Sequence, residues 1–219
     1  GPERWYPGQV QTTEGPFGHN IAKPAASCIL YRVIHRKTPW GREHNMLELI
    51  SAARRRKRTP TYSLFDVVSM EFRVGLLDID LNMHLNNGKY TKIMDRCRLE
   101  HAVVTGLLNR MIEARASAVV ANSEIAYVRE LRPYQRFMVH TRILGWDDKY
   151  TYYDQRFDSQ RKLHTHALLR VANVYGGKSV SPQTVQEMTG MNLTSPALPE
   201  YVEQWKRLLQ TKRRLTESD

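Results

Sequence analysis

The spacing of hydrophobic residues predicts a strand, one long helix and then four more strands in the middle of the chain. Apolar and polar residues alternate over residues 70–76, as in a half-buried strand. From about residue 86 to residue 111 the apolar positions recur every three or four residues, which predicts an amphipathic helix of about six turns. These positions are Tyr90, Ile93, Met94, Cys97, His101, Val104, Leu108 and Met111.

The segments after this helix favour an antiparallel sheet. Four strand-like runs cover residues 117–128, 136–146, 149–157 and 162–175, and short polar turns join the last three into a meander. A five-stranded sheet covers one long helix only if it curls round it. The expected fold class is therefore α+β, with a curved antiparallel sheet of about five strands wrapped round the helix. A short helix near residues 201–210 is expected to close the chain.

Composition and charge divide the chain into three parts. Residues 1–61 read as a basic N-terminal extension with a short helix over 42–53, residues 62–180 as the main domain, and residues 181–219 as a C-terminal extension with a helix. The net charge of +11 lies mostly in the flanks, with +7 over residues 1–65 and +3 over 206–219. The nearly neutral domain does not favour specific nucleic-acid binding.

The five cations Arg54–Arg58 have two interpretations. They form a solvated helix end that complements the helix dipole, or they contact an anionic membrane surface or nucleic acid. Two cysteines, and no apolar run of about 18 residues, favour a cytoplasmic protein. The chain does not begin with Met, so a removed targeting segment stays open.

The candidate chemistry lies between the first strand and the long helix. Six polar residues occur there within ten positions: Asp78, Asp80, Asn82, His84, Asn86 and Asn87. In an extended loop, residues two apart point the same way, so Asp80, Asn82 and His84 are expected to face one pocket. The free amides at the helix start can polarise a carbonyl group, with Asn86 or Asn87 as the N-cap. Spacing alone also allows a simpler interpretation, in which these residues supply only turns and caps.

The run from Asp80 to Tyr90 resembles a family signature. It matches the Asp-x-x-Gly-His-x-Asn-Asn-x-x-Tyr pattern of hotdog-fold thioesterases typified by 4-hydroxybenzoyl-CoA thioesterase, except that Met83 replaces the Gly. It is still closer to the Asp-x-Asn-x-His-x-Asn-Asn-x-x-Tyr form of plant acyl-ACP thioesterases. The resemblance covers roughly residues 62–205. It implies a hotdog fold and hydrolysis of acyl-CoA or acyl-ACP to a free acid and a thiol, with no cofactor and no metal.

The resemblance also implies roles for individual residues. Asp80 is expected to act as nucleophile or general base, with Asn82 and His84 positioning water or substrate. Glu130 is a weaker match to a Glu of the plant enzymes. The residues expected to bind substrate are Asn86, Asn87, Tyr90 and Met94, with Lys89, Arg129 and Arg132 as cations for a CoA diphosphate.

Members of this family pair through sheet edges, and their sites lie at the dimer interface. The resemblance therefore implies a homodimer or a dimer of dimers, in which the Asp80 loop faces the partner's sheet. Two other functions stay open. One is a hotdog protein that binds acyl groups or partners without hydrolysis. The other is an adaptor that acts through Arg54–Arg58 and the basic run Lys212–Arg214.

Overall fold

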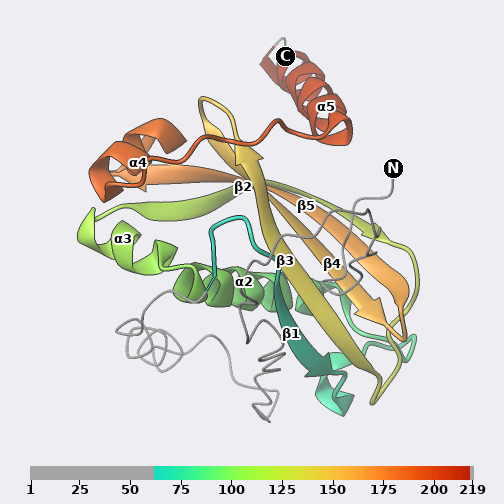
Figure 1. The fold of residues 1–219 in the computed structure, drawn as a ribbon. Coiled ribbons are helices and arrows are strands. Elements are labelled where there is room, and N and C mark those ends of the chain that lie inside the picture. The colour runs from blue at the N-terminus through green and yellow to red at the C-terminus, as the bar shows by residue number, and fades with distance from the viewer. Residues whose placement is uncertain (1–61, 218–219) are drawn as a thin grey trace, which may run out of the picture.

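A curved antiparallel sheet wraps round helix α2 (Asn87–Val104) in the computed structural model, which describes residues 62–217 (Figure 1). The sheet order is β1-β3-β4-β5-β2, and the short strand β6 pairs with β5. This confirms the predicted fold class and adds β6. The strands are β1 (Val68–Arg73), β2 (Ser117–Tyr127), β3 (Arg136–Trp146), β4 (Tyr150–Ser159), β5 (Lys162–Tyr175) and β6 (Lys178–Val180).

The core lies between α2 and the concave face of the sheet. Because strand residues alternate between the two faces, Phe137, Val139 and Ile143 of β3 all point to the helix side. They pack against the apolar stripe of α2, which includes Ile93 and Met94. The predicted periodicities of two and of three to four residues therefore meet in one hydrophobic core.

A buried glutamine joins the helix to the sheet. Gln155 of β4 donates from Nε2 to the carbonyl oxygen of Met94 (3.1 Å) and to Oγ1 of Thr141 (2.9 Å), and its Oε1 accepts from Arg98 (2.9 Å). A buried amide is costly unless it is hydrogen-bonded. These bonds meet that requirement and fix the position of α2 along the strands.

The predicted six-turn helix is interrupted near residue 105, so the prediction of one uninterrupted helix is wrong. Gly106 adopts a left-handed backbone (φ 76°), and a second helix, α3 (Leu107–Glu113), follows. The hydroxyl of Thr105 donates to the carbonyl of His101 (2.7 Å) at the end of α2. Glycine adopts this conformation without steric cost, so the change of direction is encoded at Gly106.

Two helices follow the sheet. The first, α4 (Pro182–Thr189), was not predicted, although Ser181 caps it by accepting from the amide of Thr184 (3.0 Å) and proline occupies its first turn. The second, α5 (Glu200–Glu217), is longer than the predicted helix. Its side chains Val202 and Trp205 pack on the outer face of the sheet, so α2 and α5 lie on opposite faces (Figure 1).

The segment between α4 and α5 crosses the sheet at Gly145. Oγ of Ser195 accepts from the amide of Trp146 (2.8 Å) and donates to its carbonyl (2.9 Å). A Cβ atom at position 145 would lie 2.7 Å from Oγ of Ser195 and 2.9 Å from the carbonyl oxygen of Pro196. Only glycine allows this close approach.

The predicted helix over 42–53 and the cations Arg54–Arg58 lie outside the described residues. Between residues 62 and 217, none of the helices is both long enough and apolar enough to cross a membrane.

Candidate active site

The loop before α2 is a tight turn at the end of a short ladder. Ile79 pairs with Leu85, the amide of Asp80 donates to the carbonyl of His84 (3.1 Å), and the amide of Met83 donates to the carbonyl of Asp80 (3.0 Å). The prediction that this loop is extended is therefore wrong. Asp80 and His84 face each other where the turn begins and ends, whereas Asn82 lies within the turn and is exposed.

Met83, which stands where the resembled motif has Gly, adopts a backbone conformation that favours glycine. Its φ is +57°, in the left-handed region. This conformation costs a non-glycine residue about 1–2 kcal/mol. The side chain projects into solvent, so it adds no steric conflict with the rest of the loop. The substitution therefore leaves the turn intact and only adds strain to it.

The Asp80 carboxylate is held in place and remains accessible. Its Oδ1 accepts from the amide of Asn82 (2.9 Å) and lies 3.6 Å from Nδ1 of His84. The side chains of Asp80 and His84 are 24% and 30% exposed. A carboxylate with one oxygen anchored can still use the other to attack a carbon or to accept a proton. The ring nitrogens of the adjacent imidazole can form hydrogen bonds to a substrate or to water.

Asn86 is the N-cap of α2, as predicted. Its Oδ1 accepts from the amide of Gly88 (2.9 Å), and its own amide donates to the carbonyl of Asp78 (2.8 Å). Asn87 is the first residue of the helix and is exposed. The positive end of the α2 dipole therefore begins three residues after His84.

Lys89 has an intramolecular partner. Its Nζ lies 2.9 Å from Oδ1 of Asp78, which is fully buried, and the other carboxylate oxygen accepts from the amide of Gly75 (3.1 Å). A buried carboxylate needs such compensation. Lys89, which was predicted to bind a diphosphate, therefore links the start of the loop at Asp78 to the first turn of α2.

The segment that contains Glu130 lies beside the loop. The amide of Leu85 donates to the carbonyl of Leu131 (2.8 Å). Glu130 itself is ion-paired with Arg132 (2.7 Å) and is half exposed. Within residues 62–217, no hydrogen bond or ion pair joins Glu130 to Asp80 or His84.

Tyr90 and Met94 are already packed in the core. The Tyr90 ring lies 5.0 Å from that of Tyr127 and 5.2 Å from that of Phe157, and burial raises the pKa of the Tyr90 phenol. Tyr127, at the end of β2, is half exposed. The open side next to the predicted acyl-binding residues is therefore the β2 edge.

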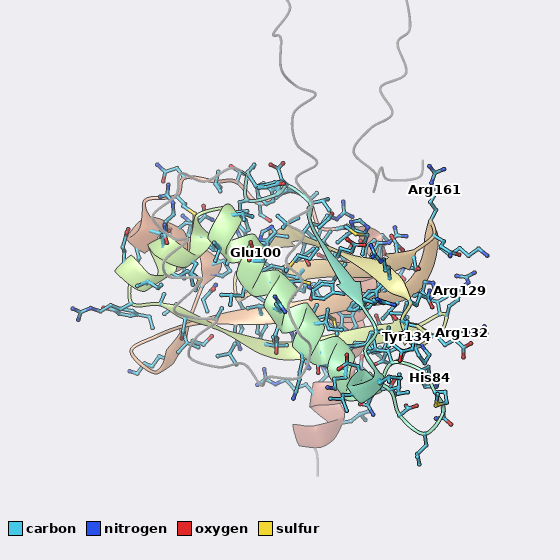
Figure 2. All side chains as sticks on the ribbon, turned by 90° about the horizontal axis from the view of Figure 1, so that it is seen from below. His84, Glu100, Arg129, Arg132, Tyr134 and Arg161 are labelled. Atoms are coloured by element: carbon cyan, nitrogen blue, oxygen red, sulfur yellow. The ribbon has the colours of Figure 1, made fainter. Side chains whose placement is uncertain are left out.

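The basic residues near the loop gather at one end of the molecule. Figure 2 shows Arg129, Arg132 and Arg161 at the same end as His84. Arg129 donates to the carbonyl of Leu163 (2.7 Å). Arg161 is exposed in the turn between β4 and β5 and was missed. The sequence identified this turn, but its separation from His84 along the chain gave no sign that the two lie at the same end of the molecule (Figure 2).

The same region of the chain matches known proteins. The sequence pattern of the thioesterase-like superfamily matches residues 74–205. Protein THEM6 from Xenopus laevis is 35% identical over 128 residues, which cover 58% of this chain and 61% of that relative. This chain therefore spans about three fifths of that relative's length.

Solved structures share the fold at low sequence identity. A probable thioesterase from Escherichia coli gives a TM-score of 0.52 at 15% identity, over 57% of this chain and 98% of that one. A mutant of 4-hydroxybenzoyl CoA thioesterase, complexed with 4-hydroxybenzoyl CoA, gives 0.50 at 12% identity, over 56% and 98%. With the family pattern covering more than half of its length, including the Asp80 loop, this chain belongs to the thioesterase-like superfamily.

Proposed function

We propose that this protein hydrolyses an acyl thioester to a free acid and a thiol, with Asp80 as the catalytic carboxylate. The observation that carries the proposal is the state of that side chain. It is anchored through one oxygen to the Asn82 amide, lies beside His84, is still accessible, and belongs to the loop that leads into α2. Membership of a thioesterase superfamily supports this chemistry.

Two routes fit the geometry of the Asp80 carboxylate. As a nucleophile, it attacks the thioester carbon, the carbon–sulfur bond breaks, and water then cleaves the acyl-aspartate. As a general base, it takes a proton from water, which attacks the same carbon directly. In both routes water supplies, overall, the proton that the departing thiolate takes up, and His84 positions that water or the substrate. The positive end of the α2 dipole stabilises the negative charge that develops on the carbonyl oxygen.

We further propose that the active protein is a homodimer formed along β2. This strand lies at one edge of the sheet, and its Val119 and Val120 are 54% and 40% exposed. A long edge strand with exposed apolar side chains is prone to pair with another strand. The partner's sheet would complete the site, and the exposed side chains of Leu81 and Met83 in the Asp80 loop would face it.

Acyl-CoA is the carrier that we propose first, with acyl-ACP as the alternative. A protein of the same fold was solved with 4-hydroxybenzoyl CoA. The exposed guanidinium groups of Arg132 and Arg161 lie at the same end as His84 and offer positive charge for a diphosphate (Figure 2). On binding, Arg132 would lose part of its ion pair with Glu130 and gain a contact to the diphosphate.

The test is a hydrolysis screen over acyl-CoA chain lengths that detects the free thiol. Asp80→Asn should lower turnover at least about a hundredfold, because it removes the nucleophile or base while keeping the side-chain shape. Asp148→Asn is the matched control, since Asp148 is exposed in the distant β3–β4 turn, and it should retain full activity. Equal rates for wild type and Asp80→Asn would refute the catalytic role. Binding of acyl-CoA without turnover would favour a non-catalytic hotdog protein.

A further inference from the structure

An apolar cavity lies at the end of α2 that is remote from the Asp80 loop. Its volume is about 50 Å³, and it opens between the sheet and the two helices α3 and α4, which lie together at that end (Figure 1). Its walls include Leu107, Met111, Ile143, Trp146, Val185 and Gln186. The α2 helix has 18 residues and is therefore about 27 Å long, so this cavity is separate from the proposed thioester site.

The walls of the cavity are held together by specific bonds. Arg110 of α3 donates to the carbonyl of Thr189 at the end of α4 (2.8 Å). Gly190 then takes a left-handed backbone (φ 66°) that turns the chain back, so that Met191 also lines the cavity. The amide of Met191 donates to the carbonyl of Gln186 (3.0 Å). These contacts hold the cavity walls in place, and none of them involves a residue of the Asp80 loop.

One polar group in the cavity wall lacks a partner. The side chain of Gln186 is orientated by its Oε1, which accepts from the amide of Leu193 (2.8 Å). Its Nε2 is buried and has no hydrogen-bond partner within the part of the chain that the structure describes. Gln186 is only 6% exposed and lines the cavity. Buried amide donors are nearly always satisfied in folded proteins, so this one calls for an acceptor atom.

We propose that this cavity binds an uncharged aliphatic molecule through a hydroxyl or carbonyl oxygen that accepts from Nε2 of Gln186. The lining contains no Asp, Glu, Lys, Arg or His side chain among the residues that the structure describes, so a carboxylate or an ammonium group would enter without charge compensation. The cavity is smaller than the roughly 150 Å³ of an engineered site that binds benzene. It therefore takes a few carbon atoms, and a longer chain extends through the opening.

Trp146 gives a direct readout of occupancy, because it lines the cavity and stacks on Phe65 at 5.6 Å between ring centroids. The probe is 6-bromohexan-1-ol, whose bromine quenches nearby tryptophan fluorescence, added to the full chain. Saturable quenching is expected, and unlabelled 1-hexanol should displace the probe. Trp146→Phe should remove the saturable component, which assigns the signal to the cavity rather than to the other tryptophans.

Two variants test the mode of binding. Gln186→Met keeps the size of the side chain but removes the donor, so it should weaken binding about tenfold. Ala118→Phe places a ring at the cavity wall from an exposed position on β2, and it should abolish saturable quenching even if Gln186→Met folds poorly. Asp80→Asn should bind the probe as the wild type does, because its carboxylate is remote.

The outcomes that would overturn the proposal are distinct from failure of the thioesterase activity. Unchanged saturable quenching in Ala118→Phe would place the probe elsewhere. Displacement by hexanoate as efficient as displacement by 1-hexanol would contradict the requirement for an uncharged ligand. Absence of saturable quenching in the wild type would show that the cavity does not admit such molecules.

Discussion

The buried histidine of α2 gives a prediction for stability against pH. His101 is fully buried, and its ring lies 6.0 Å from that of Tyr153. Burial lowers its pKa from the usual 6.5 to about 4, and this effect exceeds the opposing influence of the nearby Asp66. A lowered pKa means that the folded state favours the neutral imidazole.

The sign and size of the effect follow from this shift. Between pH 6.5 and 4 the unfolded chain binds a proton at His101 and the folded chain does not, so stability falls as the pH falls. Full stability from this group is present above pH 6.5. Lowering the pH from 7.5 to 4.5 should remove about 2.5 kcal/mol through His101 alone.

Urea unfolding of the wild type and of His101→Leu at pH 7.5 and pH 4.5 measures this loss. Leucine has a similar size and cannot be protonated, so the variant keeps the pH dependence of every other group. The decrease in unfolding free energy should be about 2.5 kcal/mol smaller in His101→Leu than in the wild type. Equal decreases in the two proteins would show that His101 takes up its proton as readily in the folded state, and would refute the reasoning.

Two further substitutions test single contacts, each by urea unfolding. Lys89→Met leaves the buried carboxylate of Asp78 without its cation and should lower the unfolding free energy by about 3 kcal/mol. The same change at exposed Lys92 of the same helix should have little effect, and equal losses would contradict the role of the ion pair. Gly145→Ala creates a backbone clash and should cost about 2–3 kcal/mol. Gly177→Ala meets open space at a φ of 76°, so it should cost less, about 1 kcal/mol of strain; a larger loss at Gly177 would contradict the close packing at Gly145.

The strands were predictable because their signal is local. The predicted and observed strands agree to within about two residues at nearly every end, since alternating burial leaves a direct trace in the sequence. The break between α2 and α3 was missed because the apolar stripe continues to Met111, which is buried through α3. The sequence did contain the signal, since Gly106 permits the left-handed turn.

The sequence by itself determined the fold class and drew attention to the Asp80 loop, because periodicity and a short motif are written into consecutive residues. It also identified Asn86 as a possible N-cap, since capping depends on neighbours in the chain. The tertiary structure alone decided which charges are paired. Lys89 faces Asp78 only once the backbone turns between them bring the two side chains together. The structure also created the cavity at α3 and α4, because its walls come from segments far apart in sequence whose shared surface no local pattern records.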